Sequence, residues 1–359
     1  MNRQAFVVPG GFSDHPPGLA AFGALLLSTP VTGTPVTRAA SEGRELGLTL
    51  ASRALQVTLS SPDPRDTPAR WLSTDPATDR ITEAFTPLHR RNAQRMLSDP
   101  VERSLHRIET AAWGTSRWSE YWGAEELQFT GQDVTALIGA WASAPPRDEP
   151  FSAAFPSPDH RYGEWAPGPL HHDAPTRADD TSTRTELAIA VPLTGEGAPM
   201  LATVAATLLG APQTGRLFHR LRIQRALAYG IAAIPVVRGR KVALLAAAST
   251  TTANASECAR HLADEVRELL SAPPAPDQVA DARTALARQV SLAHALLEAG
   301  ETLGPVHRSL LEADCTTATS ESAPATAAFS DHLPAGVRPQ WAVHGPVPDQ
   351  TLGAVEQTW

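Results

Sequence analysis

Apolar and polar residues follow each other along the chain with two periods, one typical of helices and the other typical of strands. Expected helices lie at about 17–27, 38–52, 199–209, 255–270, 277–299 and 320–331. Expected strands lie at 54–59, 229–237, 241–249 and 341–346. Gly239 separates two of these strands and supplies the residue type that a tight turn favours. The mixture of both periods predicts an α+β protein.

The same order of elements occurs twice. In each half an apolar helix, a loop rich in Pro and Gly, a second helix and a strand follow one another at similar spacing. We therefore expect two homologous αβ domains, each a mixed or antiparallel sheet with helices packed on one face. The expected domains are 1–145 and 184–359, and the Pro-rich segment 146–183, which has no periodicity, is expected to link them.

Composition narrows the class of protein. The 359 residues are 42% hydrophobic and 19% charged, which is typical of a globular protein with real cores. A net charge of −8 argues against nucleic acid as a partner, and the two cysteines imply no disulfide framework. The N-terminus lacks the apolar core of a signal peptide, and the apolar run 18–27 is too short to cross a bilayer. We expect a cytoplasmic protein with no membrane partner.

The most specific motif is TGRLFHRLRIQRALAYG at 214–230. Its leucines and phenylalanine recur at helical spacing, Arg222 falls at the shoulder of that apolar stripe, and Tyr229 opens the following strand. The motif resembles S-R-L-F-x-x-L-R-E-E-R-G-L-A-Y-S, a signature of the C-terminal domain of insulinase/pitrilysin-type zinc metallopeptidases such as the processing peptidases. The resemblance implies that Arg222 holds the substrate backbone and that Tyr229 stabilises the oxyanion of the tetrahedral intermediate.

Two points qualify this motif. Arg222 and Arg225 could instead form a solvated helix face, with Tyr229 an ordinary strand aromatic. In addition, Ala226 occupies the position where the family has glycine. If that position ends the helix with a positive φ, alanine costs roughly 1 kcal/mol there.

The expected N-terminal helix lacks residues that could bind a metal. GLAAFGALLL at 18–27 resembles G-L-A-H-F-L-E-H-M-L, the helix with the inverted zinc motif HxxEH of the same family. Ala21 and Leu25 stand where the histidines would be, and Ala24 replaces the glutamate base. Counting back from the family-like Ser98-Asp-Pro100, the third ligand position falls at Arg91-Asn92, neither of which is the family's glutamate. The resemblance therefore implies no metal in this chain.

Other candidate residues are weaker. His171-His172-Asp173 contains metal-ligand types, but adjacent residues rarely point the same way. An aromatic-rich stretch could line a peptide-binding chamber or a subunit contact, although a core role is favoured; its members are Trp113, Trp118, Tyr121 and Trp122. The sequence contains no G-x-S-x-G elbow, P-loop or dinucleotide fingerprint.

The resemblance implies a non-catalytic, zinc-free subunit of a heterodimeric metallopeptidase. A homologous partner chain would carry the zinc, and the complex would cleave peptides, for instance leader segments of small precursor peptides. The alternative is a catalytically dead scaffold or peptide-binding protein of the same fold, because core subunits of respiratory complexes resemble this family without cleaving anything. The retained Arg222 and Tyr229 argue against a pure scaffold.

Overall fold

The structure is a computed structural model, and its residues fall into two compact units. The residues that it describes are 2–29, 34–42, 44–51, 53–63, 71–72, 78–123, 129–146, 151–155, 163–166, 171–173, 184–195, 197–272, 274–299, 303, 305–313, 329–334, 336 and 338–347. Unit 1 comprises Met1–Ser98, Arg117–Ser157 and Leu296–Thr302. Unit 2 comprises Asp99–Ser116, Pro158–Ala295 and Leu303–Trp359. The units are thus discontinuous, whereas the domains expected from the sequence are continuous. Most of the expected linker lies outside the described residues.

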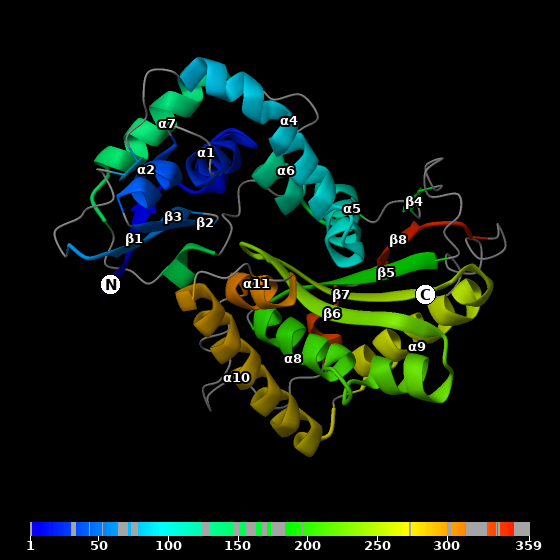
Figure 1. The fold of residues 1–359 in the computed structure, drawn as a ribbon. Coiled ribbons are helices and arrows are strands. Elements are labelled where there is room, and N and C mark those ends of the chain that lie inside the picture. The colour runs from blue at the N-terminus through cyan, green and yellow to red at the C-terminus, as the bar shows by residue number, and fades with distance from the viewer. Residues whose placement is uncertain are drawn as a thin grey trace. The chain divides into compact units, whose positions relative to one another are not determined.

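Unit 1 contains an antiparallel sheet in the order β1-β3-β2, with helices packed against it (Figure 1). Its strands are β1 (Asn2–Pro9), β2 (Glu45–Leu50) and β3 (Ala54–Ser61). Its helices are α1 (Leu19–Ser28), α2 (Pro35–Ser41), α4 (Thr78–Met96), α6 (Arg117–Trp122) and α7 (Gly131–Ser143). Phe22, Leu55 and Ile138 are buried together in its core. Trp141 of α7 donates from Nε1 to the Gly10 carbonyl oxygen at 2.8 Å, which ties that helix to the end of β1.

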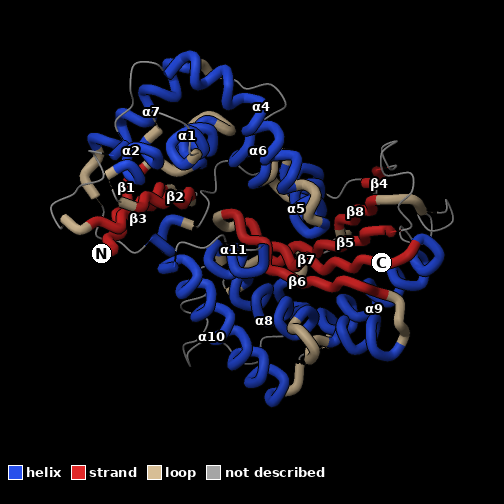
Figure 2. The backbone as a smooth tube through the Cα atoms, in the orientation of Figure 1, coloured by secondary structure: helices blue, strands red, loops and turns tan. Residues whose placement is uncertain are grey.

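Unit 2 contains a sheet in the order β4-β8-β5-β7-β6 (Figure 2). Among its described strands only the short β4–β8 pairing is parallel. Its strands are β4 (His171–Asp173), β5 (Arg184–Leu193), β6 (Ala228–Arg238), β7 (Lys241–Thr251) and β8 (Gln340–His344). β6 is an edge strand, and Pro235 within it fits that place because proline cannot donate to a ladder. Gly239 has a φ of 61° and is the first of the two residues that turn β6 into β7.

Helices cover both faces of the sheet in unit 2. α8 (Ala198–Gly210) and α9 (Ala255–Ser271) pack on one face, which side chains such as Ile189 and Leu244 fill. α5 (Pro100–Trp113) packs on the other face, where Ile108 meets Ile234 and Leu245 (Figure 1). Two further helices belong largely or wholly to this unit, α10 (Pro276–Ala299) and α11 (Pro305–Glu312).

The two units share one connectivity. In unit 1 the order is β1, α1, α2, β2, β3, and in unit 2 it is β5, α8, a π-helix, β6, β7. In both units the last strand of the series lies between the other two. The first helix of each series also follows a glycine in the left-handed region, Gly18 with φ 83° and Gly197 with φ 87°. The predicted α+β class is confirmed, and the repeated order of elements is visible in the topology.

One element was predicted wrongly. The helix expected over 38–52 is the short α2, ending at Ser41, followed by strand β2. The physical reason lies in the sequence Glu45-Leu-Gly-Leu-Thr-Leu50, where leucine alternates with other residues at the period of two that a strand requires. Most of the helix expected over 320–331 lies outside the described residues, and Phe329–His332 forms a 3₁₀ turn.

The aromatic-rich stretch divides between the units and packs inward in both. Trp113 is buried in unit 2, with its ring 5.7 Å from that of Trp165. In unit 1 the Tyr121 ring lies edge-on to Phe12 at 5.3 Å, and Trp118 donates to the Ala93 carbonyl oxygen at 3.3 Å. These contacts favour the core role for the stretch.

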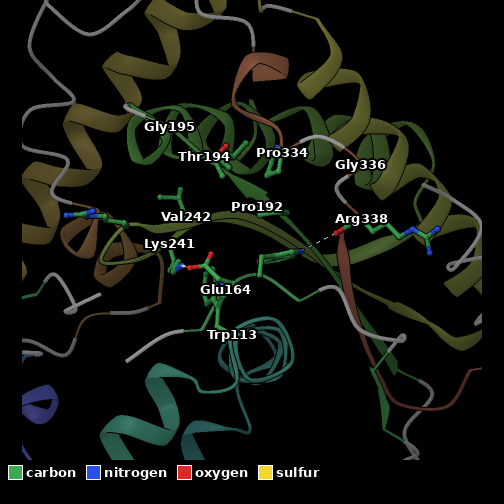
Figure 3. A pocket seen from close by; sticks show the side chains of 13 residues that line it. Trp113, Glu164, Pro192, Thr194, Gly195, Lys241, Val242, Pro334, Gly336 and Arg338 are labelled. Carbon is green, nitrogen blue, oxygen red and sulfur yellow. Dashed lines mark hydrogen bonds and ion pairs between the residues drawn. The ribbon is translucent and has the colours of Figure 1, made fainter. Parts of the chain in front are cut away.

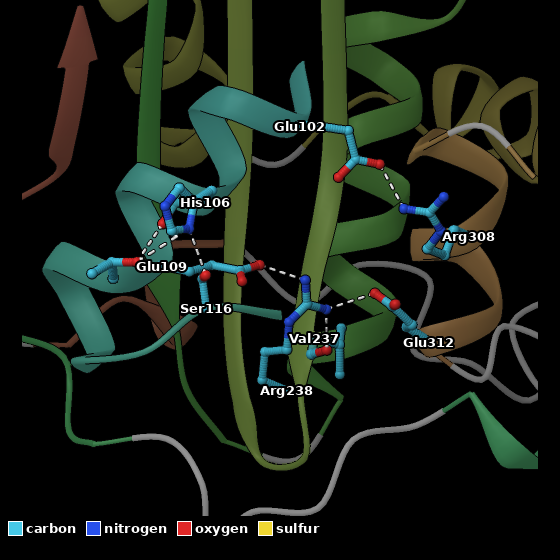
Figure 4. A network of polar contacts seen from close by, with 9 residues as sticks. Glu102, His106, Glu109, Ser116, Val237, Arg238, Arg308 and Glu312 are labelled. Carbon is cyan, nitrogen blue, oxygen red and sulfur yellow. Dashed lines mark hydrogen bonds and ion pairs between the residues drawn. The ribbon is translucent and has the colours of Figure 1, made fainter. Parts of the chain in front are cut away.

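A buried ion cluster joins α5, β6 and α11 (Figure 4). The guanidinium of Arg238, at the end of β6, donates to Glu109 of α5 and, at 2.6 Å, to Glu312 of α11. All three residues are at most 2% exposed. Arg308 of α11 donates to Glu102 of α5 at 2.6 Å, so a second ion pair connects the same two helices. The cluster links segments that are far apart in the sequence.

Replacing Arg238 with methionine should destabilise unit 2 by about 3–5 kcal/mol, because two buried carboxylates lose the cation that compensates them. Urea unfolding followed by circular dichroism measures the change in the free energy of unfolding. Lys241→Met is the matched control, since Lys241 pairs with the exposed Glu164 and should change stability by less than about 1 kcal/mol. Equal effects of both substitutions would contradict a stabilising role for the cluster.

Candidate functional site

Arg222 lies near the end of a π-helix, Phe218–Gln224. π-Helical turns are rare and are frequent at functional sites, because the wider turn displaces side chains from their α-helical positions. Leu217 and Leu221 anchor this segment in the core of unit 2, while Arg222 and Ile223 point to solvent. The Arg222 guanidinium lies over the Phe218 ring at 5.5 Å. The apolar stripe predicted from the sequence thus holds the segment, and Arg222 falls on its exposed side.

The helix ends in a strained turn. The Leu227 N–H donates to the Leu221 carbonyl oxygen at 2.7 Å, and Ala226 between them has a φ of 53°. Helices commonly end with glycine at such a left-handed residue, because a Cβ costs energy there. The sequence left open whether this position takes a positive φ; it does, and alanine at this position is therefore strained.

Tyr229 is the extra residue of a bulge in β6. The pairing with β7 shifts register between Ala228 and Gly230, and Tyr229 between them has no partner in the ladder. A bulge turns its residue out of the regular alternation of a strand. Tyr229 is 60% exposed, although Ala228 beside it is buried. The bulge, at the start of an edge strand, is what presents the phenol to solvent.

Arg222 and Tyr229 differ from their neighbours in having no polar partner. Three arginines of the same motif pair with carboxylates of α9: Arg216 and Arg220 with Glu265, and Arg225 with Glu257. Among the described residues, neither the Arg222 guanidinium nor the Tyr229 hydroxyl has a hydrogen bond or an ion pair. Since the fold uses the other three arginines, Arg222 is the arginine of the motif that remains available to a ligand, and the Tyr229 hydroxyl is available as well, as are the exposed side chains of His219 and Gln224.

The positions of the zinc motif in unit 1 serve packing. Ala21 is 3% exposed within the core, and Ala24 and Leu25 pack against that core from the same helix, α1. Arg91 and Asn92, which stand near the expected third ligand, lie on α4. The described residues contain no group of three His, Cys, Asp or Glu side chains able to hold a metal. Apolar side chains without lone pairs cannot ligate zinc, so these positions do not fit a metal site.

The imidazole of His89 on α4 packs against α1. Its ring lies 5.3 Å from Phe22, and its Nε2 is 2.8 Å from the Trp122 carbonyl oxygen. Its Nδ1 is buried and has no hydrogen-bond partner among the described residues, but one imidazole nitrogen does not make a metal site, and no described group of three ligand side chains includes it. Burial lowers the pKa of His89 and favours its neutral form.

A hollow of unit 2 lies away from Arg222 and Tyr229. It has a volume of about 500 Å³ and is lined by Trp113, Trp165, Val242 and the Lys241–Glu164 ion pair (Figure 3). Lys241 follows the far end of β6 from Tyr229, on the order of 30 Å away at the rise of a strand. This hollow is therefore separate from the exposed Arg222 and Tyr229.

The comparisons with known proteins agree with the fold and the motif. Residues 139–286, which include Arg222 and Tyr229, match the family described as the peptidase M16 inactive domain. The fold is similar to the crystal structure of the peptidase M16 inactive domain from Pseudomonas fluorescens, with 14% sequence identity and a TM-score of 0.64 over 96% of this chain and 93% of that one. The family resemblance predicted from the sequence is thus confirmed: this chain is similar to M16 peptidases through their inactive domain.

Two further solved structures share the fold. A chain of complex III2 from Candida albicans is 13% identical, with a TM-score of 0.55 over 98% of this chain and 94% of that one. The periplasmic protease PqqL from Escherichia coli is 12% identical, with a TM-score of 0.58, and the match covers 96% of this chain but 43% of PqqL. This chain therefore spans less than half the length of that protease. No curated protein matches the sequence.

Ala226→Gly should stabilise the protein by about 1 kcal/mol, because glycine adopts a φ of 53° without the cost of a Cβ. Thermal unfolding by calorimetry measures the change. Ala272→Gly is the control: it is also exposed and ends a helix, but its φ of −133° suits alanine, so glycine should not stabilise there. An unchanged or lowered melting temperature for Ala226→Gly would show that the turn is unstrained.

Purified alone, the chain should contain no stoichiometric zinc, because Ala21, Ala24 and Leu25 offer no ligand atoms. Elemental analysis after dialysis against micromolar zinc measures the content. A single zinc ion retained per chain would overturn the conclusion that these positions have lost the metal.

Proposed function

We propose that this chain is the zinc-free subunit of a heterodimeric zinc metallopeptidase. A homologous partner chain with an intact HxxEH motif completes the enzyme, and the substrate is a peptide, such as the leader segment of a small precursor peptide. The complex acts in the cytoplasm, without nucleic acid or membrane as a partner. The observation that carries the proposal is that Arg222 and Tyr229 stay exposed and unpaired in the described chain while the neighbouring arginines of the motif are paired.

Arg222 and Tyr229 suit two steps of peptide hydrolysis. A guanidinium is a permanent cation with several donors, so Arg222 binds carbonyl oxygens of the substrate backbone. The Tyr229 hydroxyl donates a hydrogen bond to the oxyanion that develops when water adds to the scissile carbonyl. The partner's zinc supplies the Lewis acid that activates this water. Neither role requires a metal in this chain.

The apolar positions of α1 support a separate zinc-bearing subunit, since the fold of unit 1 is kept while its ligand atoms are absent.

A catalytically dead scaffold is the second candidate, and the similarity to a chain of complex III2 favours it. A scaffold does not depend on an exposed phenol or an unpaired guanidinium. The effect of changing these two groups on cleavage therefore separates the two candidates.

Tyr229→Phe should lower the kcat of the reconstituted complex about 10²- to 10³-fold, because it removes one donor to the oxyanion. Arg222→Ala should chiefly raise KM, since it removes a contact to the substrate backbone. Cleavage of a quenched fluorescent peptide is measured after mixing this chain with an HxxEH-bearing chain encoded beside it, and size-exclusion chromatography verifies that the complex still forms.

Arg225→Ala is the control, because Arg225 lies on the same helix end and already pairs with Glu257. It should leave both kinetic constants near their original values. Normal cleavage by the Tyr229→Phe complex would reject the oxyanion role and favour the scaffold.

A further inference from the structure

A second, smaller cavity lies at the start of β6, the strand that begins with Ala228 and Tyr229. It has a volume of about 170 Å³ and is lined by the start of α5 and by the adjoining ends of β5, β6 and β7. Gly230, which follows Tyr229 in the chain, forms part of its wall. All its lining residues belong to unit 2. Because drug-sized ligands fill pockets of about 300–1,000 Å³, this one has room for a single side chain.

The cavity exists because the sheet carries small residues where α5 has only just begun. Further along the same face, Ile234 and Leu245 fill the space under Ile108 of α5. Beside the cavity the sheet offers Gly230, Ala232 and Ala247. Protein interiors are otherwise closely packed, so a row of small residues at one end of a filled face leaves an opening.

Glu186 of β5 provides the one carboxylate among the lining residues. The residue is 9% exposed, and Ser249 donates to its Oε1 at 2.7 Å. Its Oε2 accepts no hydrogen bond from the residues that the structure describes. This oxygen stays accessible to solvent, so a cation that enters the cavity would pair with it directly.

The surroundings agree with an uncompensated charge. Burial raises the pKa of Glu186, while the hydrogen bond from Ser249 and the charges of Arg184 and Arg103 lower it in part. Neither arginine forms an ion pair with Glu186 in the described part of the chain. The remaining walls are mostly apolar, with Val101, Ile231 and alanines. Apolar walls with a carboxylate suit a long aliphatic stem that ends in a cation.

We propose that this cavity is a specificity pocket that takes one lysine or arginine side chain of the bound peptide, with its cationic end on Glu186. The pocket rests on the proposed function in one respect, which is that the ligand is a peptide. A peptide held at Tyr229 passes next to Gly230, so the side chain that enters lies close to the bond being cleaved. The substrate class is then a peptide with a basic residue near its cleavage site.

The experiment measures binding to the full chain without its partner. The probes are fluorescein-labelled peptides Ala-Ala-X-Ala-Ala, in which X is Arg, Lys, Gln or Leu, and fluorescence polarisation gives the dissociation constants. We expect the Arg and Lys peptides to bind at least tenfold more tightly than the Gln peptide. Glu186→Gln should abolish that preference. Asp264→Asn, which removes an exposed carboxylate of α9, should leave it intact.

A second variant tests the cavity itself. Ala247→Val adds two methyl groups to the wall and should bring the Arg and Lys peptides to the affinity of the Gln peptide, with Glu186 unchanged. Equal affinities of the original protein for the Arg and Gln peptides, including no measurable binding of either, would overturn the pocket. A preference that survives Glu186→Gln would do the same. Normal cleavage by the Tyr229→Phe complex would instead reject the proposed function and leave the measured preference for basic peptides standing.

Discussion

The organisation of unit 2 depends on the burial of Arg238 between Glu109 and Glu312. Charges removed from water must be paired, so this arginine fixes α5 and α11 on the two sides of β6. With α5 seated, one face of the sheet is covered by a helix from an earlier part of the chain, and Ile108 packs on Ile234. The beginning of the same helix forms one wall of the cavity at the start of β6. The packing of this core and the shape of the site therefore both depend on the ion cluster.

Three irregularities lie close together in the segment that carries Arg222 and Tyr229. A π-helix is followed by a left-handed alanine, and then a bulge opens the edge strand β6. Each departs from the local backbone conformation of lowest energy, and strain of this kind persists where the surrounding structure stabilises it. Leu217 and Leu221 anchor this segment in the core, while the bulge turns the phenol of Tyr229 outward. The irregular backbone is what separates these two side chains from ordinary packing.

The two units share one connectivity, but their helices present different kinds of side chain. In unit 1 the helix that follows a left-handed glycine turns Ala21 into the core, with Ala24 and Leu25 packed against it, so that the ligand positions have become part of the packing. In unit 2 the second helix of the series, the π-helix Phe218–Gln224, instead presents Arg222 to solvent. The fold survives the loss of metal ligands because its stability comes from buried apolar surface, which alanine and leucine supply as well as or better than histidine and glutamate. Loss of the metal and retention of the fold are therefore compatible.

Local pattern alone determined much of this protein. The helices α8, α9 and α10 and the hairpin at Gly239 follow from residue types at fixed spacing, whereas the exchange of zinc ligands for Ala21, Ala24 and Leu25 is implied by the resemblance to a family motif. The helix predicted over 38–52 is wrong, because the alternation at 45–50 belongs to a strand. Glu186 is one of two charged residues in the strand Arg184–Leu193, and its neighbours around the cavity come from three other elements. Only the tertiary structure could seat α5 on unit 2, pair Arg238 with two distant carboxylates and bulge Tyr229 out of its ladder, because each of these results from contacts between segments far apart in the chain, which periodicity does not encode.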